Sequence, residues 1–240
     1  MSIITDNLFF GIILSLAAFE IGLYINRKTK ISIFNPLLIA IILVIGFLLA
    51  FNIDFDTYNS GAKFINMFLG PSTVALALPL YKQIDLLKKN ALSILIGILL
   101  GSIIGICSVI ALSCLLNLDS SLMKSLIPKS VTTPIGIEIC NQLEGIMPIT
   151  VLAIILSGIL GAIIGPYVCK FFRIKNSIAI GVAIGTASHA VGTTKALEIG
   201  EIEGAMSSLS IGVAGLITVF IAPAIYNLAS LICNFQAKMM

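Results

Sequence analysis

Long apolar runs separated by short polar loops make up most of this chain. Five runs approach or exceed the roughly 20 helical residues that cross a hydrocarbon core of about 30 Å; they cover residues 8–25, 36–53, 91–116, 146–169 and 205–232. A sixth run, residues 63–80, is interrupted by Gly70-Pro71 and by Pro79. The pattern predicts an all-α polytopic membrane protein with about six transmembrane crossings.

Two further segments, residues 120–145 and 177–200, mix apolar and polar positions. The charges of the loops indicate on which side of the membrane each segment begins and ends. Lys and Arg are concentrated in three loops, at 27–30, 82–89 and 170–175. Because cytoplasmic loops are enriched in Lys and Arg, we expect these loops in the cytoplasm and both chain ends outside. Each mixed segment must then leave and return on one side of the membrane. We therefore predict two re-entrant or broken-helix hairpins that enter from opposite faces.

The second half of the chain contains two similar stretches. In each, a Thr-Thr pair is followed by a Glu-Gly pair and by an apolar span with a proline; the residues are Thr132-Thr133, Glu144-Gly145 and Pro166, then Thr193-Thr194, Glu203-Gly204 and Pro223. A hairpin plus one crossing reverses the direction of the next copy, which is the arrangement of inverted repeats in secondary transporters. Chance similarity between two apolar sequences is the alternative explanation.

We expect a transport core at 120–240, with repeat 1 at about 120–175 and repeat 2 at about 176–236. Residues 1–119 would then supply N-terminal spans that act as a scaffold or as an oligomer interface. The GxxxG-type spacing of Gly97, Gly101 and Gly105, repeated at 161/165 and 181/185, is typical of closely packed helix faces. Such faces either pack within one protomer or form the seam of a homo-oligomer.

Composition and charge exclude several classes of function. Hydrophobic residues make up 58% of the chain and charged residues 10%, against roughly 45–50% and 25% in soluble domains, which excludes a soluble protein. The formal net charge of +3 is too small and too dispersed for a nucleic-acid partner. The five cysteines lack CxxC spacing and only one histidine is present, so we expect no metal and no cofactor.

Both hairpins carry hydroxyl groups, a Lys and a Glu beside helix-breaking Pro or Gly. Charged side chains such as Lys129 cost about 3 kcal/mol each at the centre of a lipid-facing helix, so we infer a polar cavity enclosed by protein. Half-helices that begin after Pro134 and Gly192 would aim free N–H groups at a small anion there. The candidate substrate-binding residues are Lys129, Ser130, Thr132, Thr133, Ser188, His189, Thr193, Thr194 and Lys195.

Two interpretations remain for these side chains. The hydroxyl groups either bind a substrate carboxylate or satisfy backbone groups at loop and helix ends, and each lysine either supplies countercharge or reaches the interface. His189 and Glu138 are candidates for coupling transport to protons, although a structural histidine fits the sequence equally well. Adjacency in sequence does not give Ser188 and His189 a catalytic geometry, so we expect no catalytic residues and no enzyme.

The runs PKSVTTPIG at 128–136 and GTASHAVGTTKA at 185–196, together with Glu203-Gly204-Ala205, resemble the LrgB/CidB family of membrane proteins. Members usually work beside a small membrane partner of the LrgA/CidA type and were first described as holin- or antiholin-like modulators of murein hydrolase activity and cell lysis. The resemblance also implies transport, because a fused plastid relative exports glycolate and glycerate, and some bacterial pairs are associated with pyruvate uptake. It implies a location in the bacterial cell membrane.

Two functions follow from the sequence. The first is a carrier for small monocarboxylates of the pyruvate, glycolate or glycerate type, working by alternating access with an LrgA/CidA-type partner. The alternative is a holin/antiholin-like regulator of murein hydrolase activity and cell lysis that acts through oligomerisation. The two polar hairpins favour the carrier, because a regulator of this kind would need only close-packing helix faces.

Overall fold

The computed structural model describes residues 7, 9–29, 34–68, 71, 74–75 and 77–237, with the side chains of 66, 77, 79, 80 and 230–237 left undescribed. Lys30 of the first basic loop and Gly70 of the interrupted sixth run lie outside these residues. The described part is helical, and the chain divides into two compact units, Met1–Leu76 and Ala77–Met240. The long helix expected among the N-terminal spans at 91–116 therefore belongs to the same unit as both predicted hairpins.

The first unit contains α2 (Phe9–Thr29), α3 (Pro36–Ala50) and α4 (Phe55–Asn66), and α2 packs against the other two. Close approach is possible because Gly22 faces the Pro36 backbone, where any Cβ would clash. Helix α3 begins cleanly because the Asn35 side chain caps the Leu37 amide and Pro36 occupies the first turn.

Four helices in the described part of the chain are long and apolar enough to cross a membrane: α2, α7 (Ile84–Leu115), α10 (Met147–Phe171) and α12 (Glu201–Ala237). They coincide with four predicted spans. The predicted span 36–53 is only the 15-residue α3, about 22 Å long at 1.5 Å per residue. The predicted run 63–80 is shared between the end of α4 and the short α6 (Ala77–Lys82).

Residues 120–145 form a helical hairpin against the first half of α10. Helix α8 (Ser120–Leu126) runs parallel to α10, since Thr150 donates to the Ser125 carbonyl at 2.8 Å and Ser157, farther along, donates to the Lys129 carbonyl at 2.6 Å. Helix α9 (Thr133–Gln142) then returns toward the start of α10. The tip of the hairpin, residues 127–132, therefore lies beside the middle of α10.

Residues 177–199 form a second hairpin. Its two helical arms together carry the single label α11 (Ser177–Ile199). The backbone breaks at His189, where φ is 41° and ψ is −136°. The two arms fold back on each other, because a Cβ at Gly192 would lie 3.0 Å from Ile184 Cγ2, whereas residues eight apart in one straight helix are about 12 Å apart. The break lies at His189, so the prediction that the second half-helix begins after Gly192 was wrong.

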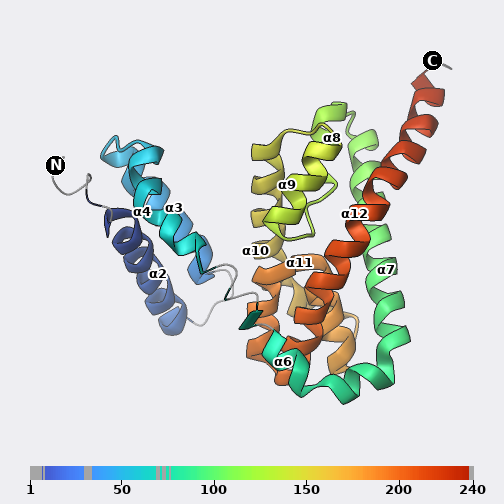
Figure 1. Ribbon diagram of the computed structural model, residues 1–240, viewed down its shortest axis with the longest axis horizontal. Helices are drawn as coiled ribbons and strands as arrows, with labels where there is room; N and C mark the ends of the chain where they lie inside the picture. Colours follow the sequence, from blue (N-terminus) through green and yellow to red (C-terminus); the bar gives the residue numbers. More distant parts are fainter. Residues whose placement is uncertain are drawn as a thin grey trace. The chain divides into compact units, whose positions relative to one another are not determined.

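Contacts with α12 give the direction of each arm of the second hairpin. In the first arm, Gly181 faces Glu203 and Gly185 faces Ser207, so this arm runs parallel to α12. In the returning arm, Thr193 lies against Ser207, 2.7 Å between hydroxyl oxygens, and residue 197 lies against Gly204. The hairpin thus starts and ends beside the beginning of α12, as Figure 1 also shows. Each hairpin has the same relation to the long helix that follows it.

Two separate hydrophobic cores lie along α7 and α12, which run side by side in the same direction (Figure 1). One core joins the early parts of these helices to the second hairpin; its buried residues are Ile94, Ile98, Val182, Ala205, Met206 and Ala214. The other joins their later parts to the first hairpin; its buried residues are Ile106, Val109, Ile110, Ile127, Val131, Ile139, Leu143 and Ala222. The two hairpins therefore occupy opposite ends of the second unit.

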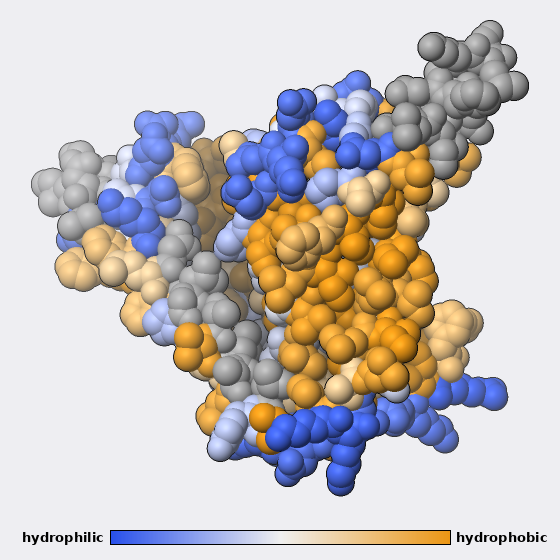
Figure 2. All heavy atoms as spheres, turned by 45° about the vertical axis from the view of Figure 1, so that its right-hand side comes forward, coloured by the Kyte–Doolittle hydropathy of each residue, from blue (hydrophilic) through white to orange (hydrophobic). Residues whose placement is uncertain are grey.

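A broad hydrophobic band crosses the visible face of the second unit in Figure 2, with hydrophilic residues above and below it. Large apolar side chains such as Leu100, Leu156 and Phe220 are exposed on the outer faces of α7, α10 and α12. Exposure of this kind is unfavourable in water but is what a lipid-facing surface requires. The fold is thus that of an all-α membrane protein.

Gly185 provides a test of the hairpin geometry. Because a Cβ at this position would overlap the Ser207 carbonyl oxygen and lie 2.7 Å from its Cα, we expect Gly185→Ala to lower the free energy of unfolding by roughly 1–3 kcal/mol through overpacking. The matched control is Gly212→Ala in α12, where a Cβ would meet nothing within 4 Å. Thermal unfolding of the purified protein in detergent measures both. Equal midpoints for the two variants would contradict the close packing of α11 on α12.

Candidate functional site

The tips of both hairpins meet the middle of α10. The Lys129 carbonyl at the first tip accepts a hydrogen bond from Ser157, and His189 Nε2 at the second tip lies 2.9 Å from the Ile154 carbonyl oxygen. Gly158 and Gly161 give room for the second tip, because a Cβ on either would overlap His189 or Ser188. Both breaks in helical structure are thus held by one short stretch of α10, about halfway along its length.

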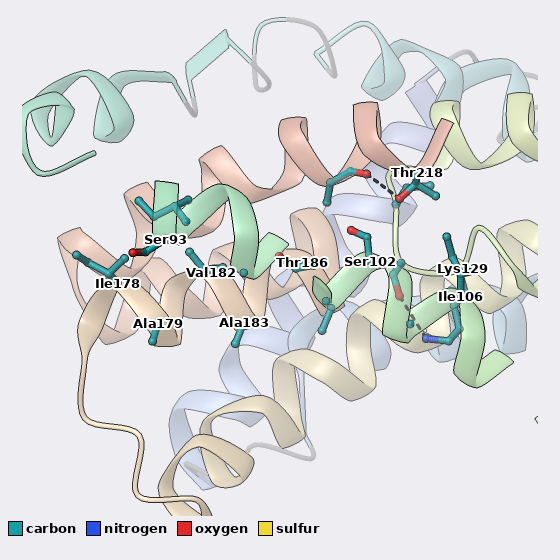
Figure 3. Close-up of a pocket in the computed structure, with 18 of the residues that line it drawn as sticks. Ser93, Ser102, Ile106, Lys129, Ile178, Ala179, Val182, Ala183, Thr186 and Thr218 are labelled. Carbon is teal, nitrogen blue, oxygen red and sulfur yellow. Dashed lines mark hydrogen bonds between the residues drawn. The ribbon is translucent and has the colours of Figure 1, made fainter. Parts of the chain in front are cut away.

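A cavity of about 740 Å³ lies in the second unit between α7, the first arm of α11, the first hairpin tip and α12 (Figure 3). Its lining on α7 runs from Asn90 to Ile106, about 24 Å along the helix. Most of the lining is small or apolar, and the polar groups are Asn90, Ser93, Ser102, Lys129, Ser130, Asn176, Thr186 and Thr218. The cavity thus combines an apolar wall with a few hydroxyl groups and one cation, as small-molecule sites often do.

Lys129 supplies that cation. Its ammonium group lies 3.2 Å from the Ser130 hydroxyl, and no carboxylate among the described residues forms an ion pair with it. The Lys129 side chain is half-buried and lies at the first hairpin tip. An ammonium group in this environment would be stabilised by a bound anion.

The glycines of α7 border this cavity, and two of the three, Gly97 and Gly101, lie on the packing face predicted for them. A Cβ at Gly97 would lie 3.6 Å from Val182, and one at Gly101 would lie 3.1 Å from Thr186, whereas at Gly105 it would meet nothing within 4 Å. The face therefore packs against α11 within the same chain and opens to the cavity at Gly105.

Of the nine predicted binding residues, Lys129 and Ser130 line the cavity. Thr132 is the N-terminal cap residue of α9 and Thr133 its first residue, both half-buried and outside the cavity lining. Glu138, predicted for coupling, is exposed on α9. These three side chains are near the first tip in sequence, but none of them lines the cavity.

The predicted residues of the second hairpin fall into two groups, neither of which lines the cavity. Ser188, His189 and Thr193 are buried; Thr193 also donates to the His189 carbonyl at 3.0 Å, so it supports the break in α11. Thr194 is exposed and bonds to its own helix, and Lys195 forms a 2.7 Å ion pair with Glu198.

The sequence analysis missed several cavity residues, chiefly Ser102, Thr186 and Thr218. Ser102 and Thr218 lie inside long apolar helices, where a single hydroxyl group is common and carries no distinguishing pattern. Thr186 was within the quoted motif at 185–196 but was passed over for its neighbours. The signal that identifies it is structural: it shares a wall with the glycines of α7.

Similarity to known proteins identifies the family of this chain. The LrgB-like family model matches residues 15–228. The chain belongs to the LrgB-like family.

Relatives of this LrgB-like protein include two that are named antiholin-like protein LrgB. The one from Bacillus subtilis (strain 168) is 40% identical over 225 residues, which cover 93% of this chain and 97% of the relative. The one from Bacillus cereus (strain B4264) is 41% identical over 216 residues, which cover 90% and 94%. No solved structure matches this chain significantly. The names agree with the second of the two functions inferred from the sequence, and neither name mentions transport.

Accessibility to a charged reagent tests the cavity of this LrgB-like protein. In a variant without the five native cysteines, Ala183→Cys lies in the cavity lining and Leu216→Cys on the outer face of α12. We expect a negatively charged methanethiosulfonate to modify the cavity position at least about tenfold faster, because the reactive thiolate forms in water and not in hydrocarbon. Mass spectrometry of the protein in liposomes measures both rates. Equal rates would show that the space is filled by lipid chains.

Proposed function

We propose that this protein is a membrane carrier for small monocarboxylates that works by alternating access. The observation that carries the proposal is the meeting of two oppositely placed hairpin tips halfway along α10, beside a cavity that contains the unpaired cation Lys129. Broken helices that meet near the membrane centre are the usual substrate sites of secondary transporters.

In this proposal the second unit contains an inverted repeat. Each copy is one hairpin followed by one long helix, the first ending with α10 and the second with α12. Two further likenesses support it: each hairpin's first arm is parallel to the following helix, and a proline lies inside each of these helices, Pro166 and Pro223. The Glu-Gly pairs differ, because Glu144 precedes α10 whereas Glu203 is in the first turn of α12.

The cavity corresponds to a state of the carrier open toward the basic loops. Its lining begins at Asn90 and Asn176, next to the basic residues at 88–89 and 170–175, which we place in the cytoplasm. At the opposite end, hairpin and α12 are joined: Ser120 and Tyr226 hydroxyl oxygens are 3.0 Å apart, and the Lys124 ammonium lies 5.7 Å from the Tyr226 ring centre. These contacts would form the closed outer side.

A monocarboxylate suits the charge of this site. One ammonium group and a few neutral hydroxyl donors can bind a single carboxylate and still release it, whereas a dianion would leave one charge uncompensated in an apolar cavity. His189 and Glu138 remain our candidates for proton coupling. For His189 this role requires its bond to the Ile154 carbonyl to break during the cycle.

The lysine that binds substrate can be identified by a matched pair of variants. In proteoliposomes we expect saturable uptake of labelled pyruvate or glycolate by the unmodified protein and a loss of at least about tenfold in Lys129→Ala, since a charge-assisted hydrogen bond is removed. Lys195→Ala removes a lysine that is paired with Glu198 outside the cavity, and uptake should persist. The reverse pattern would place the anion at the second hairpin and not in the cavity.

A holin/antiholin-like regulator of murein hydrolase activity is the second candidate function, and it is favoured by the names of the Bacillus relatives. In that case the exposed apolar faces of the long helices would form an assembly with an LrgA/CidA-type partner or with further copies of this chain. Both functions place the protein in a bacterial cell membrane.

Solute leakage separates the two functions. A carrier should take up pyruvate with saturation and leave liposomes tight to an unrelated dye such as carboxyfluorescein, because its cavity opens to one side at a time. A pore should release the dye without saturation. The assay is run with this protein alone and with an LrgA/CidA-type partner, so that a function requiring the partner is also detected. Dye release without saturable pyruvate uptake would rule out the carrier.

A further inference from the structure

The cavity of the second unit is elongated along two parallel helices. Its lining on α7 runs from Asn90 to Ile106, about 24 Å at 1.5 Å per residue. The first arm of α11 lines it as well and runs parallel to α7, because a Cβ at Gly97 would lie 3.6 Å from Val182 and, one turn later, a Cβ at Gly101 would lie 3.1 Å from Thr186. The space therefore has two distinct ends.

Charge is found at only one of these ends. Lys129 is the only charged residue among the described residues that line the cavity. It lies at the Ile106 end, because Ile106 packs in one hydrophobic core with Ile127 and Val131, on either side of Lys129 in the sequence. Figure 3 shows Lys129 and Ile106 at one end of the cavity and Ile178 at the other.

The opposite end carries two amide side chains that already have partners. Asn90 donates to the Leu86 carbonyl at 2.9 Å, and Asn176 caps α11 by accepting from the Ala179 amide at 3.1 Å. Between the two ends the wall is chiefly Ile, Val, Ala and Gly. A ligand held at Lys129 that extends along this wall therefore meets mainly hydrocarbon.

A three-carbon acid at Lys129 leaves most of the cavity unused. Such an acid has six heavy atoms, and at roughly 30 Å³ per heavy atom, the share of one water molecule in the liquid, it fills about a quarter of the 740 Å³. The remaining apolar wall would stay in contact with water, although an apolar partner is favoured there. An elongated apolar space with one terminal cation fits an anion that carries an alkyl chain.

We propose that this cavity binds single-chain amphiphilic carboxylates of about eight to twelve carbons, with the carboxylate at Lys129 and the alkyl chain along α7 toward Asn90, and that such a ligand blocks uptake. The binding depends on the cavity alone, whereas the block rests on the carrier function proposed above. The ligand differs in kind from pyruvate, glycolate and glycerate, which have no alkyl chain. Each methylene group that leaves water should raise the affinity about twofold to fourfold.

Protection of a cavity cysteine measures this binding directly. In the Ala183→Cys protein described above, in liposomes, we expect decanoate to slow modification by the negatively charged methanethiosulfonate at free concentrations at least about fifteenfold lower than hexanoate, because four further methylene groups leave water. Free concentrations are measured in the aqueous phase after the liposomes are removed. Uptake of labelled pyruvate by the unmodified protein should be inhibited in the same order.

Lys129→Met tests where the carboxylate lies, because methionine keeps an unbranched side chain without the charge. In the Ala183→Cys background this change should weaken protection by decanoate at least about tenfold, since a charge-assisted hydrogen bond is lost. Protection by decanol, which has the same chain and no charge, should change less than about twofold. A carboxylate bound instead at the basic loops would leave both ligands unaffected.

A cavity-filling variant separates binding in the cavity from effects on the bilayer. Gly105 lines the cavity and a Cβ there would meet nothing within 4 Å, so Gly105→Leu should occupy part of the space and reduce the advantage of decanoate over hexanoate to less than about threefold. The matched control is Gly212→Leu, on α12 outside the lining, where a Cβ also meets nothing within 4 Å. This control should keep the full advantage.

Three results would refute the inference and leave a saturable carrier standing: equal protection by hexanoate and decanoate, an advantage that persists in Gly105→Leu as fully as in Gly212→Leu, or decanoate binding that does not respond to Lys129→Met. Protection by decanoate without saturable pyruvate uptake would uphold the binding site and refute the carrier function. Because the comparison of chain lengths needs only the Ala183→Cys protein, the inference stays testable even if the other variants do not fold.

Discussion

The second unit depends on one constraint: backbone N–H and C=O groups at a break in a helix need hydrogen-bond partners, although their surroundings are apolar. A helix that stops in hydrocarbon leaves N–H and C=O groups without partners, and each such group costs several kcal/mol. Here α10 supplies what the breaks require: the Ser157 hydroxyl for the Lys129 carbonyl, the Ile154 carbonyl for His189, and glycines where the second tip must approach. The position of both tips follows from that one stretch of helix.

His189 illustrates how the break is maintained. A positive φ in a non-glycine residue is uncommon and costs of order 1–3 kcal/mol, so it persists only where the surroundings compensate. At this residue the ring binds the Ile154 carbonyl and the backbone carbonyl accepts from Thr193, which is itself bound to Ser207. Several of the polar groups that mark the second hairpin in the sequence are therefore used to build the turn.

Some polar side chains build the turns and others line the cavity, and this difference explains what could be predicted from sequence. Apolar run lengths correctly placed α2, α7, α10 and α12, because a lipid-spanning helix has a strong compositional signal. The mixed character of 120–145 and 177–200 correctly indicated hairpins. It could not separate residues whose hydroxyl supports a turn, such as Thr193, from residues that line the cavity, such as Thr186, because that depends on which side of a hairpin arm meets α7 and which meets α12. For the same reason Ser102 was missed inside an apolar helix.

The separation of the two hydrophobic cores has a mechanical consequence. Each hairpin is packed with its own section of α7 and α12, and the cavity lies alongside the stretch where one core gives way to the other. A relative tilt of the two halves would bend those long helices near the void and would leave the side chains interlocked around each hairpin undisturbed. Shape change in such a molecule would resemble the flexing of a hinge between two stiff blocks, with α7 and α12 bending where they pass the empty volume.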